Sequence, residues 1–120
     1  MDRKSDDIYF MDIARMVATR STCERRAVGA VLVIDKHIIS TGYNGARSGE
    51  PHCLDVGCQM EDGHCTRTLH AEENALNWVM INTRWDLSDA TLYCTVQPCT
   101  DCQSLINNCG ATVIFGERYR

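Results

Sequence analysis

The chain has 120 residues, a formal net charge of −4 and a hydrophobic fraction of 44%. These values predict one domain over residues 1–120 with an apolar core of its own, and they exclude disordered or low-complexity sequence. The acidic charge is unfavourable for binding nucleic acid through its phosphates. No apolar run approaches the roughly 18 residues of a membrane span. We therefore expect neither a nucleic acid nor a membrane as a partner.

Eight cysteines are a high number for a chain of this length. The polar N-terminal segment lacks the features of a secretory signal, which predicts a cytoplasmic location. In a reducing compartment, cysteines are expected to be metal ligands or buried thiols rather than disulfides. Cys94 and Cys109 fall inside predicted regular elements, where buried thiols are the simpler interpretation.

Hydrophobic periodicity and helix-breaking residues predict seven helices and strands. Ser5 can cap the first helix, and Gly110 suits the C-terminal cap of the last one. Trp78 is placed on the apolar side of the second helix, together with Ala71, Ala75 and Val79. The predicted elements are a helix from Ser5 to about Arg20, strands at 27–34 and 37–43 joined by a turn at Asp35 and Lys36, a helix at 70–81, a strand at 90–96, a helix at 98–109 and a strand at 111–115.

The order of these elements predicts the fold class. The run AVGAVLVI at 27–34 is apolar on both faces, as in a strand covered from both sides. The last three strands are separated by helices, which favours parallel crossover connections. We therefore expect an α/β fold with helices on both faces of a mixed sheet. Residues 44–69 show no clear period, and a stretch of this length without secondary structure is usually functional.

Four residues form the chemically most informative pattern, His70, Glu72, Cys99 and Cys102. The two cysteines stand in a C-x-x-C at the start of a predicted helix, where thiolates are favoured. Two thiolates and one imidazole make three zinc ligands and leave a fourth position for water. Glu72 can then move a proton between that water and a leaving nitrogen. H-x-E followed by P-C-x-x-C is typical of zinc nucleobase deaminases.

Two simpler interpretations compete with a zinc site. A C-x-x-C can be a redox motif, but the thioredoxin-like context is absent from this sequence. A single histidine on a helix is usually an ordinary surface or core residue. The joint pattern is more specific than either of these parts.

The sequence resembles the cytidine deaminase superfamily and, within it, the deoxycytidylate (dCMP) deaminases of bacteria and phages. The segments that carry the resemblance are STCERRAVGAVLV at 21–33, STGYNG at 40–45, PHCLDVGC at 51–58, DGHCTRTLHAEENAL at 62–76 and ATLYCTVQPCTDC at 90–102. The resemblance implies a cytidine-deaminase-like three-layer α-β-α sandwich with a mixed sheet of four to five strands. It also implies zinc-dependent hydrolysis of dCMP to dUMP and ammonia, which feeds thymidylate synthesis.

The resemblance assigns roles to individual residues. It implies that His70, Cys99 and Cys102 bind the catalytic zinc and that Glu72 shuttles protons. The substrate contacts it implies are Asn44 on the sugar, the backbone of Ala71 at the pyrimidine edge, and Arg25 or Arg26 on the phosphate.

A second, structural zinc and an effector site are further implications. The preferred ligand set for the second zinc is Cys23 and Cys53 with two of Cys58, His64 and Cys65. A metal would order a loop that has too little apolar content to order itself. Gly42, Asn44 and Gly45 match the family's pattern near a site for dCTP and dTTP, bound with Mg²⁺. The resemblance also suggests a homo-oligomer, a hexamer.

Other functions on the same motifs remain open. A deaminase acting on dCTP or on free cytidine or deoxycytidine would share every zinc ligand. A tRNA adenosine deaminase would normally have a basic surface and a shorter loop before His70. A zinc module without catalysis would have no need of Glu72.

Overall fold

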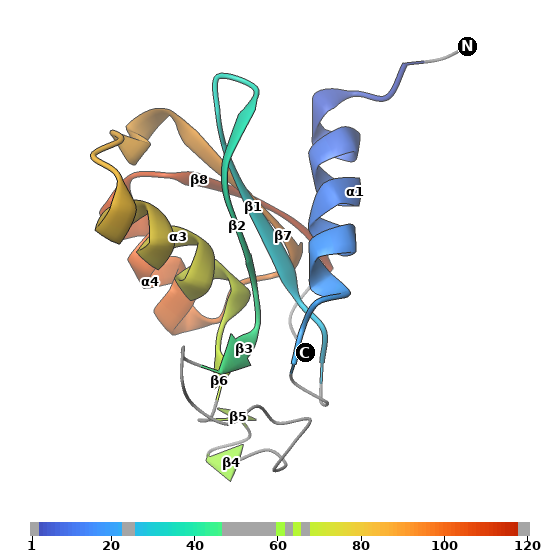
Figure 1. Cartoon of the computed structure of the whole chain (residues 1–120), viewed down its shortest axis with the longest axis vertical. Coiled ribbons are helices and arrows are strands. Elements are labelled where there is room, and N and C mark those ends of the chain that lie inside the picture. The colour runs from blue at the N-terminus through green and yellow to red at the C-terminus, as the bar shows by residue number, and fades with distance from the viewer. Residues whose placement is uncertain (1–2, 23–25, 47–59, 62–63, 66–67, 118–120) are drawn as a thin grey trace.

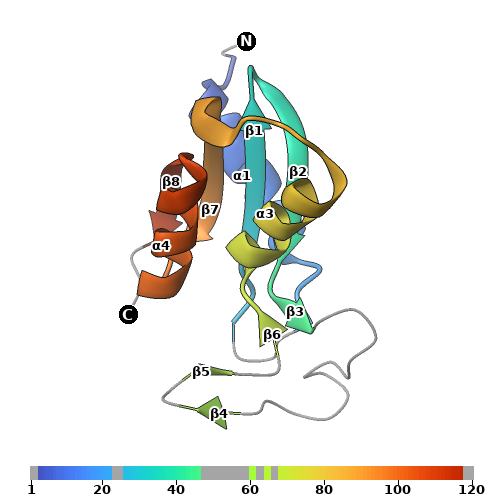
Figure 2. The ribbon, with the colours of Figure 1, turned by 90° about the vertical axis from the view of Figure 1, so that its left-hand side faces the viewer.

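The computed structural model describes residues 3–22, 26–46, 60–61, 64–65 and 68–117. Within them the chain forms a four-stranded sheet in the order β2–β1–β7–β8 (Figure 1). Helix α1 covers one face of this sheet, and helices α3 and α4 cover the other (Figure 2). The bounds are α1 (Asp6–Ala18), β1 (Gly29–Ile34), β2 (His37–Tyr43), α3 (Ala71–Asn82), β7 (Ala90–Val96), α4 (Thr100–Cys109) and β8 (Thr112–Glu117). This arrangement confirms the predicted three-layer α/β fold.

The strand directions follow the connections between the strands. β1 is antiparallel to both β2 and β7, and β7 is parallel to β8. β2, β7 and β8 therefore run the same way, as expected for strands separated by helices. β1 and β2 form a hairpin whose turn residues, Asp35 and Lys36, both have positive φ, at 49° and 63°. Two successive positive φ values are what a two-residue hairpin turn requires, which confirms the predicted turn.

Strands β1, β7 and β8 each contribute side chains to two separate cores, one on either face of the sheet. Ala30 and Leu32 of β1 pack in the cluster that contains α3 and α4 residues, whereas Val31 and Val33 pack in the cluster under α1. All four side chains are buried, because successive residues of a strand point to opposite faces. This double burial confirms that the apolar run at 27–34 lies inside a sheet covered on both sides.

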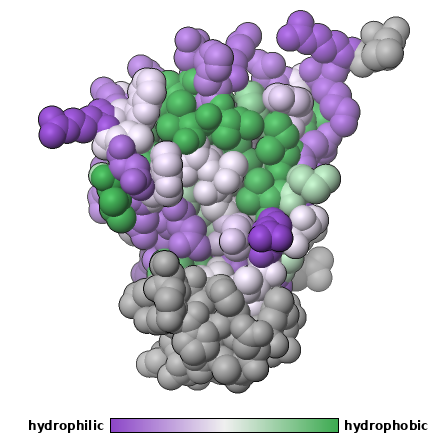
Figure 3. All heavy atoms as spheres, viewed as in Figure 1, coloured by the Kyte–Doolittle hydropathy of each residue, from purple (hydrophilic) through white to green (hydrophobic). Residues whose placement is uncertain are grey.

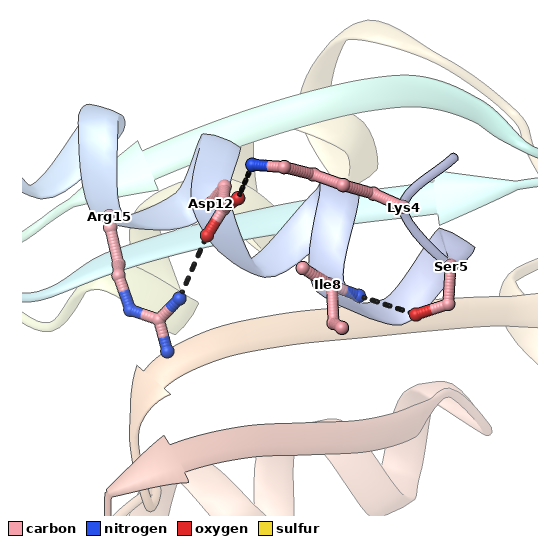
Figure 4. A network of polar contacts seen from close by, with 5 residues as sticks. All are labelled: Lys4, Ser5, Ile8, Asp12 and Arg15. Atoms are coloured by element: carbon pink, nitrogen blue, oxygen red, sulfur yellow. Dashed lines mark hydrogen bonds and ion pairs between the residues drawn. The ribbon is translucent and has the colours of Figure 1, made fainter. Parts of the chain in front are cut away.

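Helix α1 begins as the sequence predicts. The Ser5 side chain accepts a hydrogen bond from the backbone N–H of Ile8 at 3.3 Å and caps the helix. On the outer side, Asp12 binds both Lys4 and Arg15 (Figure 4). These exposed ion pairs contribute little to stability. The helix ends at Ala18 rather than near Arg20.

The predicted start of the third helix and the prediction for residues 44–69 need correction. α4 begins at Thr100 and not at Pro98, because Cys99 has the extended backbone of an N-cap. The segment 44–69, predicted to lack secondary structure, contains short strands that form one long-range pair and one local pair. β3 (Gly45–Ala46) pairs with β6 (Thr68–Leu69), and β4 (Met60–Glu61) pairs with β5 (His64–Cys65). A short 3₁₀ helix, η1 (Leu87–Asp89), precedes β7.

Large hydrophobic side chains reach the surface of α1 and α3. The exposed fractions are 70% for Met16, 50% for Trp78 and 80% for Ile81. Figure 3 shows hydrophobic residues among polar ones on the face that includes these helices. The prediction that Trp78 lies on the apolar side of its helix is wrong, because the buried side of α3 carries Ala75 and Val79. No helix in the described part of the chain has the length and apolar character to cross a bilayer.

Candidate metal centre

The three predicted zinc ligands meet where two helices begin. His70 is the N-cap residue of α3, Cys99 is the N-cap residue of α4, and Cys102 lies in the first turn of α4. Both helices follow the carboxyl ends of strands that run in the same direction, β2 and β7, which is where α/β sheets usually place their sites. The positive ends of both helix dipoles therefore favour negatively charged ligands at this point.

The distances between these side chains fit a zinc ion. His70 Nδ1 lies 3.1 Å from Cys102 Sγ and 3.4 Å from Cys99 Sγ. In a tetrahedral site with Zn–S bonds of about 2.3 Å and Zn–N bonds of about 2.0 Å, two ligand atoms lie roughly 3.5 Å apart. All three ligand atoms lie within 4.8 Å of one another, and the described residues contain no other such group of three or more. Three ligands leave one position open, as in catalytic zinc sites.

Glu72 lies beside this group and is buried, with an exposed fraction of 3%. Burial raises the pKa of its carboxyl, although its own backbone N–H, the Cys102 thiol, His70 and the Cys94 thiol each favour the ionised form. A divalent cation next to the carboxylate would also favour the ionised form and so lower the pKa of Glu72. The arrangement therefore places a carboxyl group that can accept and return a proton beside the three candidate ligands.

Burial also acts on the two thiols that face Glu72. It raises the pKa of Cys94 and of Cys102, and the negative charge of Glu72 adds to the rise in each. A bound cation reverses this for a ligand, because it deprotonates a coordinating thiol. None of the described cysteines Cys94, Cys99, Cys102 and Cys109 forms a disulfide. Cys94 is fully buried and Cys109 is half-buried, so the description as buried thiols is correct for the first and partly correct for the second.

Close packing holds α3 in place over β2. A Cβ atom added to Gly42 would lie 2.3 Å from the Ala71 carbonyl oxygen and 2.5 Å from the Ala75 nitrogen. No side chain fits at this position, because the strand and helix backbones are in contact. The Ser40 hydroxyl donates to the Ala75 carbonyl at 2.9 Å and adds a second link between the same elements. Gly42 thus positions the helix that carries His70 and Glu72.

Asn44 binds the segment that leads into β1. Its Oδ1 accepts from the Val28 N–H at 2.9 Å, and its Nδ2 donates to the Arg26 carbonyl oxygen. Its own carbonyl oxygen accepts from the Thr22 N–H at 3.2 Å and from the Ser21 hydroxyl at 3.1 Å. The side chain is 8% exposed. Asn44 therefore fixes the segment of Arg26, one of the two arginines predicted to contact phosphate.

The other predicted site residues have different outcomes. The backbone of Ala71 opens α3 directly after His70, next to the metal group. The Arg26 side chain is exposed, and Gly45 is buried beside Thr22 and Tyr43. Arg25, Cys23, Cys53 and Cys58 lie outside the described residues. Only the strand positions of His64 and Cys65 are described, so the second metal site stays a prediction.

Sequence reasoning missed three residues that shape the site. Glu73 accepts a hydrogen bond from the His70 N–H at 3.2 Å, which holds the backbone of a proposed ligand. Its position three residues after an N-cap was a usable sign. Cys94 faces Glu72, and strand alternation from the apolar Leu92 would have predicted that direction. Asn74 donates to the Tyr43 carbonyl oxygen, a contact between distant residues that no local pattern predicts.

The sequence is similar to those of a bacterial protein and of a phage deaminase. The ComE operon protein 2 of Bacillus subtilis is 44% identical over 122 residues, which cover all of this chain and 64% of that protein. The deoxycytidylate deaminase of Mycobacterium phage D29 is 42% identical, with 88% of this chain and 89% of that protein covered. The chain thus spans less than two thirds of the Bacillus protein and most of the phage one.

A solved structure has the same fold. The dCMP deaminase of cyanophage S-TIM5, in complex with dCMP and dUMP, superposes with a TM-score of 0.83 at 32% identity, covering all of this chain and 87% of that one. The sequence profile of one family, described as the cytidine and deoxycytidylate deaminase zinc-binding region, matches residues 4–117. With three converging side chains that could hold a metal ion and this match over nearly its whole length, the chain belongs to the cytidine and deoxycytidylate deaminase zinc-binding family.

Proposed function

We propose that this chain hydrolyses dCMP to dUMP and ammonia in a zinc-dependent reaction. The observation that carries the proposal is the buried Glu72 carboxylate beside the converging His70, Cys99 and Cys102 side chains. Relatives named deoxycytidylate deaminase, and the cyanophage enzyme that holds dCMP and dUMP, support the choice of substrate.

His70, Cys99 and Cys102 would hold the zinc. When bound there, zinc would lower the pKa of a water molecule and so supply a nucleophile at neutral pH. Two thiolates balance the charge of the ion, and the open fourth position leaves room for the water. Glu73 and the N-terminal turn of α3 keep His70 oriented toward the sulfur atoms.

Glu72 would carry the protons of the reaction. Its carboxylate accepts one proton from the attacking water and delivers it to N3 of the cytosine ring. As the C4–N bond breaks, Glu72 passes the second proton of the water to the departing amino group, which leaves as ammonia. One water is consumed, and the oxygen stays on C4 of the uracil ring. The buried position excludes bulk water from this transfer.

Substrate recognition would involve the end of β2 and the segment before β1. Asn44 would bind the sugar, the backbone of Ala71 would meet the pyrimidine edge, and Arg25 or Arg26 would bind the 5′-phosphate. The hydrogen bonds from Asn44 to the Arg26–Val28 segment support a link between sugar and phosphate recognition. A charge-assisted contact to phosphate is among the stronger hydrogen bonds.

The proposal is tested by assaying ammonia release and the loss of cytosine absorbance with four substrates in parallel. These are deoxycytidine, dCMP, dCTP and a tRNA. We expect the highest kcat/KM for dCMP. Equal values for deoxycytidine and dCMP would refute a phosphate site. Preferred turnover of dCTP, of the free nucleoside or of adenosine in tRNA would assign one of the other activities.

A second, structural zinc is also proposed, held by Cys23 and Cys53 with two of Cys58, His64 and Cys65. The density of cysteine and histidine between the described elements supports it. Metal analysis of the purified protein should find about two zinc ions per chain. One ion per chain that persists after Cys53→Ser would contradict this proposal.

Assembly and regulation complete the proposal. A single domain over residues 1–120 would form a homo-oligomer, a hexamer, in the cytoplasm, and the exposed Met16, Trp78 and Met80 side chains support a subunit interface. An effector site near Gly42, Asn44 and Gly45 would bind dCTP or dTTP with Mg²⁺. Sigmoidal dCMP kinetics should become hyperbolic with dCTP. Kinetics that are hyperbolic and unaffected by either nucleotide would contradict regulation.

A further inference from the structure

One side chain joins the two halves of the proposed site. The Nδ2 atom of Asn74, on α3, donates to the backbone carbonyl oxygen of Tyr43, the last residue of β2, at 2.7 Å. A carbonyl oxygen can only accept, so the amide nitrogen must be the group that faces it. The two residues are 31 positions apart in the sequence, and the bond is partly buried.

The bond connects the metal group with the sugar-binding residue. Asn74 lies one turn into α3, and its backbone N–H donates to the His70 carbonyl at 3.0 Å. The Tyr43 carbonyl belongs to the peptide unit that leads into Asn44. Asn74 therefore spans from the helix turn that carries His70 and Glu72 to the peptide that carries Asn44.

Asn44 is held independently on its other side. Its amide group binds the backbone of Arg26 and Val28, and its backbone N–H donates to the Val28 carbonyl at 3.3 Å. These bonds attach Asn44 to the entry of β1, and none of them involves an atom of α3. The Asn74 bond acts on the peptide next to Asn44 from the α3 side and ties it to the helix turn that carries His70 and Glu72.

The fold does not depend on this bond. The backbone contact at Gly42 and the hydrogen bond from Ser40 to Ala75 hold α3 on β2 without it. Loss of the Asn74 amide is therefore expected to free the Tyr43–Asn44 peptide locally while the helix stays in place. An effect of Asn74 on substrate binding can therefore be measured in a protein that keeps its fold.

We propose that Asn74 is a positioning residue that sets the place of Asn44 relative to Glu72 and the metal ligands, and so determines recognition of the deoxyribose. The inference rests on the proposed function for its substrate. The deoxyribose of dCMP has one free hydroxyl, at the 3′ carbon, which is the group that Asn44 would bind. A contact of equal strength in the ground and transition states affects KM and leaves kcat unchanged.

The test uses Asn74→Ala and the isosteric Asn74→Asp, which lacks the donor when ionised. Asn77→Ala and Asn77→Asp, at a half-buried position of the same helix, control for the loss of an asparagine and for added charge. Zinc content, KM and kcat are measured for dCMP and for its analogue that lacks the 3′-hydroxyl. Amide hydrogen exchange over residues 41–46 gives a readout independent of catalysis.

We expect both Asn74 variants to keep their zinc and to raise KM for dCMP about 5- to 10-fold, the effect of one lost hydrogen bond. Their kcat should change less than about threefold, and their preference for dCMP over the analogue should fall by the same factor as KM rises. Exchange over 41–46 should be faster in them than in the Asn77 controls. Unchanged KM with unchanged exchange would overturn the inference.

The proposed function and the positioning role of Asn74 can fail independently of each other. If the wild-type protein does not deaminate dCMP, the substrate assignment fails. Faster exchange over 41–46 in the Asn74 variants would then still support the positioning role, and unchanged exchange would overturn it as well.

Discussion

Two glycines on neighbouring strands bring a helix onto each face of the sheet. A Cβ atom on Gly29 would lie 2.0 Å from the Ala14 carbonyl oxygen of α1, and one on Gly42 would lie 2.3 Å from the Ala71 carbonyl oxygen of α3. The two positions are adjacent in the ladder, since Ala30 pairs with Gly42 and Gly29 pairs with Tyr43. The same packing device therefore serves both faces at one end of the sheet.

The helices on the two faces of the sheet differ in what their N-cap side chains do. On the α1 face, Ser5 performs ordinary N-capping. On the other face, the N-cap residues are His70 and Cys99, and the Cys99 side chain makes no capping hydrogen bond. Their side-chain atoms face one another instead. The helix start on the α1 face thus contributes to stability alone, whereas the helix starts on the other face also bring together the side chains of the candidate site.

The largest effect is expected from replacing a candidate metal ligand. These ligands all lie on the face of the sheet that α3 and α4 cover. Cys102→Ser is expected to remove tightly bound zinc and all measurable deamination. Zinc should then no longer raise the unfolding temperature, because a metal stabilises only a state that binds it. Metal analysis and thermal unfolding with and without zinc measure this. Cys109→Ser, at the other end of α4, is the control and should retain zinc.

Glu72→Gln should have the next largest effect. The amide cannot accept and return the proton, so kcat should fall about 10²- to 10⁴-fold while zinc content stays the same. Glu73→Gln is the matched control, because its side-chain oxygen can still accept from the His70 N–H. Turnover by Glu72→Gln within a few-fold of wild type would remove Glu72 from the mechanism.

The two glycines test the comparison directly. Gly29→Ala and Gly42→Ala should each reduce the free energy of unfolding by about 3 kcal/mol, at the upper end of overpacking effects, because backbone atoms must move. Denaturant unfolding measures the loss. The activity of the folded fraction should fall more for Gly42→Ala, since only α3 carries His70 and Glu72. Equal losses of activity would show that the faces are not independent.

Tyr93→Phe should give the smallest effect, on the α1 face. The Tyr93 hydroxyl donates to Asp7 at 2.7 Å, and burial, with this bond and the charge of Asp7, raises the pKa of Tyr93 to about 12. The bond should contribute about 1–2 kcal/mol at neutral pH. Because the folded pKa lies above the ordinary 10.0, that contribution is complete below pH 10 and is lost between pH 10 and 12.

The measurement for Tyr93→Phe is the free energy of unfolding across that pH range. The variant should be less stable than wild type at neutral pH and should decline less between pH 10 and 12. Tyr9→Phe, at an exposed position of α1, serves as the control. Activity at neutral pH should be unchanged in both variants. A decline with pH as steep as that of wild type would refute the role of the Tyr93 hydroxyl.

Local pattern was sufficient for the main helices and strands and for the three side chains that converge as a candidate metal site. The apolar run at 27–34, the Asp35–Lys36 turn and the Gly110 cap, whose φ is 83°, each reflect a requirement of the residues themselves. His70, Cys99 and Cys102 are identifiable because zinc accepts few residue types. The boundary at Pro98 was two residues off because a cap and a first turn look alike in sequence.

Contacts between distant parts of the chain required the folded structure. Gly42 was predicted to lie in a strand and near an effector site, but its role as the point where β2 meets α3 was not visible in the sequence. Asn44 was predicted to contact a sugar, and its bonds to Arg26 and Val28 were not foreseen. The bond from Asn74 to Tyr43 joins α3 to β2, and the periodicity of the sequence does not predict that these two residues meet. Residue type and spacing determine which elements form and which groups can bind a metal, whereas packing alone determines which backbone atoms meet.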